Sequence, residues 1–312
     1  MKDLSVVIPV YNSASHVHLT IERLESALIK TGFSFEIILI NDGSSDNSWK
    51  VIDAISQVNS HVVAIELMRN FGQDNAIMAG LHVATGGQII IMDDDLQHDP
   101  NDIPLLINEI NLDYDVVYAN FREKQHSLIK NLGSWFNGKV ANIVIGKPEA
   151  IYLSPFKIFT AKVKDELIKY EGPYPYVDGL IFRITRNIGQ ITVDHHERKI
   201  GVSNYNLWKS FKVWLNLATS FSVIPLRASV LLGFIASILA FIMAAIFVVQ
   251  YCLNERGPSG WASLIVTVLF FSGTQLIAIG FAGEYIGRTY LHLNRNPQSI
   301  VRKISRINEA IR

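Results

Sequence analysis

The segment Gln88-Ile-Ile-Ile-Met-Asp-Asp-Asp-Leu-Gln97 joins a short apolar run directly to three consecutive aspartates. A run of this kind, without alternating polar residues, predicts a strand that is buried on both faces of its sheet. Similar runs rich in β-branched residues begin at Leu4, Phe35, Val62 and Asp115, and helical patterns lie between them. This alternation predicts an α/β domain with a mostly parallel, Rossmann-like sheet between two layers of helices.

The predicted carboxyl ends of three strands carry polar and acidic residues, and open α/β sheets bind their ligands beyond these ends. The residues lie in the segments Pro9–Asn12, Asn41–Ser44 and Asp93–Asp95. Because alternate residues of a strand face the same side, the sequence predicts that Asp93 and Asp95 point together, with Gln97 beside them.

The acidic run is the candidate metal site of the chain. Two neighbouring carboxylates repel each other unless a cation compensates their charge. Oxygen ligands suit Mg²⁺ or Mn²⁺, either of which would keep coordination positions for phosphate oxygens. The sequence therefore predicts a divalent metal bound by Asp93, Asp95 and Gln97. A solvated helix N-terminus, where aspartate is also common, is the alternative interpretation of these residues.

Composition excludes several classes of protein. The 312 residues include 28 basic and 28 acidic side chains, so we expect no nucleic-acid partner. A hydrophobic content of 49% excludes a disordered chain, and a single cysteine excludes a disulfide framework. The patterns G-x-G-x-x-G after the first strand and G-x-x-x-x-G-K-S/T are both absent from the sequence, which argues against an NAD dehydrogenase or a P-loop NTPase.

Two long stretches, Ala228–Leu253 and Trp261–Gly283, contain no charged residue. At roughly 1.5 Å per residue in a helix, each exceeds the ~30 Å hydrocarbon core of a bilayer, so the sequence predicts two transmembrane helices. Basic residues flank the pair on its outer ends, whereas the connecting loop carries only Arg256, next to Glu255. The positive-inside rule then predicts that both termini and the α/β domain are cytoplasmic.

The sequence thus predicts four successive parts. Residues 203–225 mix tryptophan, phenylalanine, tyrosine and lysine at helical spacing, which is typical of helices in the membrane interface. The expected organisation is an α/β domain, interfacial amphipathic helices, two transmembrane helices and a basic cytoplasmic tail, over residues 1–202, 203–225, 226–290 and 291–312.

An ordered set of motifs resembles the family-2 glycosyltransferases, which have the GT-A fold. The motifs are Val7-Ile-Pro-Val-Tyr-Asn12, Asn41-Asp-Gly-Ser44, Arg69-Asn-Phe-Gly72 and Asp93-Asp-Asp-Leu-Gln97. More closely, Asp99-Pro100 after the acidic run and the segment Gly283–Tyr290 resemble the polyprenyl-phosphate branch. This branch includes dolichol-phosphate mannose synthases and bacterial undecaprenyl-phosphate sugar transferases.

The resemblance implies a role for individual residues. The nucleotide would be held by Pro9, Tyr11, Asp42, Arg69 and Asp94. The catalytic residues would be Asp93, Asp95 and Arg122, and the acceptor phosphate would be bound by Arg122, Ser154, Lys157 and Arg198. The sequence departs from the family pattern at Ser13, Pro155 and Asn204.

The resemblance implies an inverting transfer of a sugar from a nucleotide-sugar, with UDP as the expected nucleotide, to undecaprenyl phosphate at the bacterial inner membrane. Its product would serve a cell-envelope glycan or modify one. A phosphate acceptor is mostly a dianion at neutral pH, so it needs little help from a general base. The resemblance also implies self-association, up to a tetramer. The alternatives are a degenerate nucleotide-binding membrane scaffold and a polysaccharide synthase, although the Gln-x-x-Arg-Trp motif of such synthases is absent from the sequence.

Overall fold

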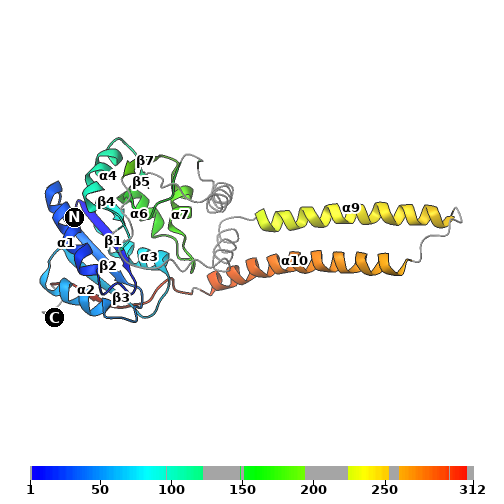
Figure 1. Cartoon of the computed structure of the whole chain (residues 1–312), viewed down its shortest axis with the longest axis horizontal. Coiled ribbons are helices and arrows are strands. Elements are labelled where there is room, and N and C mark those ends of the chain that lie inside the picture. The colour runs from blue at the N-terminus through cyan, green and yellow to red at the C-terminus, as the bar shows by residue number, and fades with distance from the viewer. Residues whose placement is uncertain are drawn as a thin grey trace. The chain divides into compact units, whose positions relative to one another are not determined.

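The computed structural model of the chain describes residues 2–95, 97–121, 148, 151–193, 224–252, 260–294 and 296–307. The chain divides into two compact units (Figure 1). Unit 1 comprises Met1–Tyr205 together with Arg295–Arg312, and unit 2 comprises Asn206–Asn294. Residues 203–223 of the predicted interfacial segment 203–225 lie outside the described residues, and so do the site candidates Arg122 and Arg198.

Unit 1 is built on one sheet, which has eight strands among the described residues, in the order β7-β5-β6-β4-β1-β2-β3-β8. Its strands are β1 (Leu4–Val10), β2 (Phe35–Asn41), β3 (Val62–Leu67), β4 (Gln88–Ile91), β5 (Val116–Phe121), β6 (Lys157–Thr160), β7 (Ile188–Val193) and β8 (Val301–Ser305). Four of the seven described pairings are parallel, namely β1 with β2, β1 with β4, β2 with β3, and β5 with β7. The prediction of an α/β fold with a mostly parallel sheet is therefore confirmed, but the sheet is mixed because β6 and β8 pair antiparallel with their neighbours.

Helices cover both faces of this sheet, which explains why its central strands are apolar throughout. The helices α1 (Val17–Thr31), α2 (Ser48–Val58) and α4 (Ile103–Ile110) pack on one face around a continuous apolar core. The helix α3 (Gln73–Val83) covers the other face, where Gly80 brings it against the side chains of Val7 and Ile40. Three shorter helices, η1 (Pro100–Asp102), α6 (Ala161–Leu167) and α7 (Val177–Ile184), complete the described part of unit 1.

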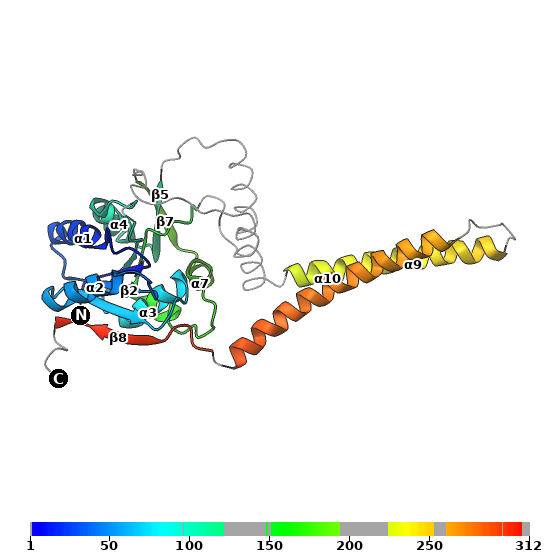
Figure 2. The same ribbon diagram turned by 60° about the horizontal axis from the view of Figure 1, so that its bottom comes forward.

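The strand β8 was not predicted, because the sequence suggested only a basic tail here. It lies antiparallel to β3 at the edge of the sheet (Figure 2). The Met68 N–H donates to the Ile300 carbonyl over 2.9 Å, and Arg302 Nη1 lies 3.3 Å from Glu66 Oε1. Lys303 Nζ forms a further ion pair with Asp53 of α2. Segments as far apart in sequence as Glu66 and Arg302, which are 236 residues apart, are thereby joined in one sheet.

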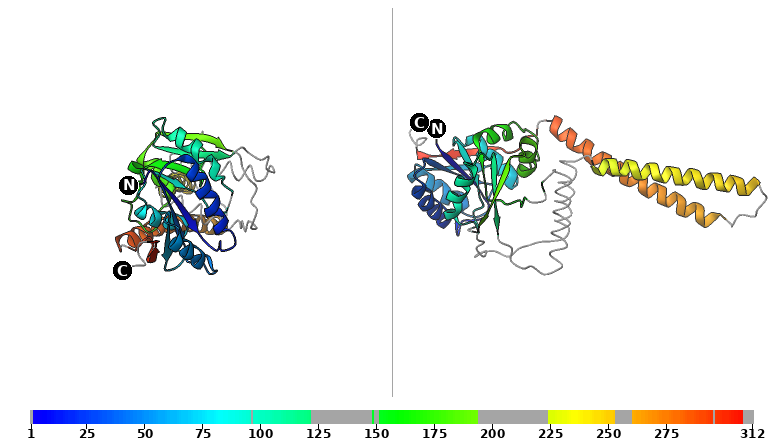
Figure 3. Two further views of the ribbon diagram at one scale, coloured as in Figure 1. Left: turned by 90° about the vertical axis from the view of Figure 1, so that its left-hand side faces the viewer. Right: turned by 90° about the horizontal axis from the view of Figure 1, so that it is seen from above.

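Unit 2 contains the two longest described helices, α9 (Ile224–Cys252) and α10 (Trp261–Leu293), which lie side by side (Figures 2 and 3). Both form over the stretches that the sequence predicts to be helical. Within the described residues, however, neither these nor any other helix has the length and apolarity needed to span a membrane. The predicted transmembrane hairpin is therefore not confirmed.

Candidate active site

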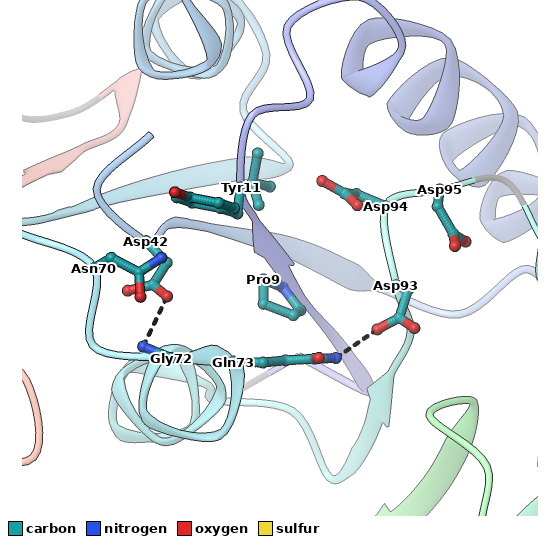
Figure 4. A pocket seen from close by; sticks show the side chains of 10 residues that line it. Pro9, Tyr11, Asp42, Asn70, Gly72, Gln73, Asp93, Asp94 and Asp95 are labelled. Atoms are coloured by element: carbon teal, nitrogen blue, oxygen red, sulfur yellow. Dashed lines mark hydrogen bonds between the residues drawn. The ribbon is translucent and has the colours of Figure 1, made fainter. Parts of the chain in front are cut away.

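A cavity of about 300 Å³ lies beyond the carboxyl ends of β1, β2 and β4 (Figure 4). This is the position that the order of the parallel strands predicts for a ligand. The cavity is lined by Pro9, Val10, Tyr11, Asp42, Asn70, Gly72, Gln73, Asp93, Asp94 and Asp95. Of the residues predicted to bind the nucleotide or a metal, the structure brings six together here, whereas Arg69 and Gln97 are not among its lining residues.

The end of β1 supplies an exposed aromatic ring. Tyr11 is 52% exposed, and the next residue, Asn12, turns the chain with a positive φ of 55°. The turn is held because the Asn12 N–H donates to Ser44 Oγ over 3.0 Å, while Asn12 Oδ1 accepts from the Ser45 N–H over 2.8 Å. These bonds fix Tyr11 at the edge of the cavity, where its ring can stack against a planar base.

Asp42, at the end of β2, fixes the loop that follows β3. Its Oδ1 accepts from the Phe71 N–H over 2.7 Å and its Oδ2 accepts from the Gly72 N–H over 2.9 Å. The neighbouring Gly43 has a φ of +61°, and a Cβ there would collide with the backbone of Arg69. The buried Asp42 carboxylate therefore shapes the cavity wall, and its predicted contact with a nucleotide stays a prediction.

Arg69, in the loop after β3, and Gln73, the first residue of α3, differ from the sequence-based expectation. The guanidinium of Arg69 lies over the Phe71 ring, 4.2 Å from its centroid, rather than on the cavity wall. Gln73, which the sequence did not single out, lines the cavity and donates from Nε2 to Asp93 Oδ1 over 2.7 Å (Figure 4). Its position directly after the Arg69–Gly72 motif was the signal available in the sequence.

The three aspartates follow the end of β4 at Ile91, so they belong to a loop and not to the strand. The expected strand alternation therefore does not orient Asp93 and Asp95. Instead, Asp93 is directed toward Gln73 and Asp94 toward Tyr11 (Figure 4). Thr20 Oγ1 of α1 donates to the Asp94 carbonyl over 2.9 Å, and the Gln97 N–H donates to Asp95 Oδ1 over 3.2 Å. We name residues 93–98 the acidic loop.

Burial and neighbouring negative charge disfavour ionisation in the acidic loop. Burial raises the pKa of Asp93 to about 7, with further contributions from Asp95 and Asp94 that outweigh the opposing effect of Lys157. Burial also raises the pKa of Asp94. Among the described residues, Asp94 Oδ2 is a buried atom that finds no hydrogen-bond partner. An unpartnered carboxylate oxygen at this cavity fits a bound cation, because Mg²⁺ and Mn²⁺ prefer hard oxygen ligands.

No group of three or more His, Cys, Asp or Glu side chains within the described residues is arranged to hold a metal ion. Asp93, Asp94 and Asp95 line the cavity, and their carboxylate oxygens are of the type that Mg²⁺ and Mn²⁺ prefer. The predicted ligand set of Asp93, Asp95 and Gln97 stays a prediction.

Two residues predicted to bind the acceptor phosphate are buried in unit 1. Ser154 Oγ accepts from the Phe156 N–H over 3.1 Å, and Ser154 is 1% exposed. Lys157 Nζ forms an ion pair with Asp178 Oδ1, which also accepts from the Tyr118 hydroxyl over 2.8 Å. Neither residue is among those that line the described cavity. Their proposed contact with a phosphate is untested and stays a prediction.

The fold is of the α/β GT-A type. The fold resembles that of glucosyl-3-phosphoglycerate synthase from Mycobacterium tuberculosis in complex with Mn²⁺ and UDP-glucose, with a TM-score of 0.52. The two chains are 15% identical, and the match covers 70% of this chain and 77% of that one. A second structure of the same synthase, with UDP alone, gives a TM-score of 0.53.

Residues 5–164 match the family described as Glycosyl transferase family 2, and the chain belongs to this family. It is 32% identical over 307 residues to an undecaprenyl-phosphate 4-deoxy-4-formamido-L-arabinose transferase of Yersinia enterocolitica. It is 33% identical over 310 residues to the protein of that name from Pectobacterium atrosepticum. Each match covers 97% of this chain and 94% of the relative.

Metal affinity should rise with pH, because a protonated Asp93 carboxyl must lose its proton before it can bind a cation. With a pKa of about 7, the apparent Mn²⁺ affinity of the donor-free protein should increase about tenfold between pH 6 and pH 8 and then level off. Isothermal titration calorimetry at fixed pH measures this dependence. Asp93→Asn is the control and should bind Mn²⁺ more weakly with a flatter pH profile. A pH-independent affinity of the unsubstituted protein contradicts the prediction.

Replacing Lys157 should destabilise unit 1, because Asp178 would keep a largely buried carboxylate without its cation. We expect Lys157→Met to lower the free energy of unfolding by about 3–5 kcal/mol, measured by chemical denaturation. The double variant Lys157→Met with Asp178→Asn is the matched control and should recover most of the loss. The prediction fails if the double variant is no more stable than the single one.

Proposed function

We propose that this chain transfers a sugar from a UDP-sugar to undecaprenyl phosphate at a bacterial membrane, for the modification of a cell-envelope glycan such as lipid A. The observation that carries the proposal is the cavity that joins Tyr11 and Asp42 to Asp93, Asp94 and Asp95. Two relatives that match 97% of this chain are named for transfer to undecaprenyl phosphate. Both facts support a donor site of the nucleotide-sugar type and a lipid-phosphate acceptor.

The donor would lie along the carboxyl ends of β1, β2 and β4. In this arrangement Tyr11 stacks on the base, because its ring is exposed at the cavity edge. The diphosphate then reaches the acidic loop, where Asp93, Asp94 and Asp95 would hold Mg²⁺ or Mn²⁺. When bound, the metal neutralises the negative charge that develops on the departing nucleoside diphosphate. A relative in fold has been crystallised with Mn²⁺ and UDP-glucose, which supports this choice of ligands.

The acceptor needs no strong base. A phosphate monoester has a second pKa of about 6 and is mostly dianionic at neutral pH. Its oxygen attacks the anomeric carbon of the sugar, the bond from that carbon to the diphosphate oxygen breaks, and the nucleoside diphosphate leaves with the electron pair. In-line attack inverts the anomeric centre. The chain contributes alignment of the two phosphates and charge compensation.

A lipid acceptor requires contact with a membrane, and unit 2 offers the surface for it. The described parts of α9 and α10 expose many large apolar side chains, including Phe234, Phe241, Phe270, Leu276 and Ile277, each more than 60% exposed. An exposed apolar surface of this extent indicates a partner other than water. We propose that this surface contacts lipid. The cytoplasmic position of unit 1 stays a prediction from the charge distribution of the sequence.

The test uses the full chain in vesicles that contain undecaprenyl phosphate, with a panel of UDP-sugars that includes UDP-4-deoxy-4-formamido-L-arabinose. We expect one sugar to appear on the lipid in the presence of Mg²⁺ or Mn²⁺, as identified by mass spectrometry. Asp95→Asn should reduce the rate at least about 100-fold, because the carboxylate no longer supports the charged transition state.

The control variant for this assay is Asp165→Asn, which removes an exposed carboxylate on α6, and it should leave the rate unchanged. Binding of UDP without any lipid-linked product would support the nucleotide-binding scaffold instead. Full activity of Asp95→Asn would exclude the proposed role of the acidic loop.

A further inference from the structure

The acidic loop folds back on itself through His98. The backbone N–H of Asp93, at the start of the loop, donates to His98 Nδ1, at its end, over 3.3 Å. His98 is 4% exposed, so this bond is shielded from water. One side chain therefore links Asp93, at one end of the acidic loop, to His98 at the other.

The imidazole of His98 rests on a rigid support. It stacks on the Phe156 ring with a centroid distance of 5.3 Å and an interplanar angle of 13°. Phe156 is fully buried, and its carbonyl accepts from the Ala119 N–H of β5 over 3.0 Å. The next residue, Lys157, begins β6 and lies opposite Ile91, the last residue of β4. The His98 imidazole is thus supported by the residue that precedes β6. β6 is the neighbour of β4, and the acidic loop follows β4.

The direction of this hydrogen bond defines the state of His98. Because a backbone N–H can only donate, Nδ1 must carry a lone pair, and the ring proton of the neutral imidazole lies on Nε2. The bond fixes the backbone at Asp93, and a separate hydrogen bond from Gln73 fixes its carboxylate. Groups that orient metal ligands in this way commonly control metal affinity.

We propose that His98 is a positioning residue of the donor site. By accepting from the Asp93 N–H while stacked on Phe156, it holds the acidic loop in the conformation that presents Asp93 and Asp95 to a divalent cation. The inference deepens the proposed function and rests on it for the role of the metal. Because Phe156 stacks on His98, it connects the acidic loop to the segment that contains Ser154 and Lys157.

Matched substitutions separate the hydrogen bond from the ring stacking. His98→Phe keeps an aromatic ring on Phe156 but removes the acceptor. His98→Asn removes the ring but keeps an acceptor atom near the position of Nδ1. The probe is Mn²⁺ alone, titrated into the donor-free full chain by calorimetry, with the melting temperature measured in the absence of metal.

We expect His98→Phe to weaken Mn²⁺ binding about 10- to 100-fold, in the range found for residues that orient metal ligands. His98→Asn should lower the melting temperature but keep the Mn²⁺ affinity within about threefold of the unsubstituted chain, since the orienting bond is retained. A positioning role also predicts that His98→Phe raises the KM for the UDP-sugar more than it lowers kcat.

Three results would overturn the proposal: an unchanged Mn²⁺ affinity of His98→Phe, an equal loss in His98→Asn, or no Mn²⁺ binding by the unsubstituted chain. If His98→Phe does not fold, His98→Leu replaces it, because it also removes the acceptor and should weaken Mn²⁺ binding to the same extent. Metal binding is measured without transfer. A chain that binds Mn²⁺ as expected but makes no lipid-linked sugar would therefore overturn only the proposed function.

Discussion

Three carboxylates at the end of an apolar strand are the constraint on which this site depends. Ile89, Ile90 and Ile91 of β4 are completely buried. Asp93 follows two residues after Ile91, and burial raises the pKa of its carboxyl group to about 7. Neighbouring elements position the group: Thr20 of α1 and Gln73 of α3 each contribute a hydrogen bond. The hard oxygens of the group suit a cation and, with the cation, a diphosphate.

The sequence predicted the parts of this site that depend on local pattern. Apolar runs identified the parallel strands, and the carboxyl ends of parallel strands meet at one edge, so Tyr11, Asp42 and the aspartates could be assigned to one cavity. The detailed orientation could not be predicted, because β4 ends at Ile91 and hydrogen bonds within a loop replace the alternation of a strand. Gln73 was not predicted, because its partner Asp93 lies 20 residues away in the sequence.

Other features could not be predicted because they depend on contacts between segments that are distant in the sequence. β6 enters the sheet antiparallel and brings the Lys157 side chain to Asp178, a partner that no local pattern reveals. The predicted contact of Lys157 with a phosphate stays a prediction. The segment Val301–Ser305 alternates too little and carries too many charges to be recognised as a strand. It becomes one because β3 would otherwise present unpaired backbone groups at the edge of the sheet.

The position of β8 makes unit 1 discontinuous, with α9 and α10 inserted between its seventh and eighth strands. A ribosome must therefore synthesise the whole helical insertion before the sheet can be completed, and β3 keeps an open edge until then. Removing the helices by truncation would leave that edge permanently uncovered. A version of unit 1 without unit 2 is better obtained by splicing, in which a short flexible linker replaces 206–294 and β8 is retained.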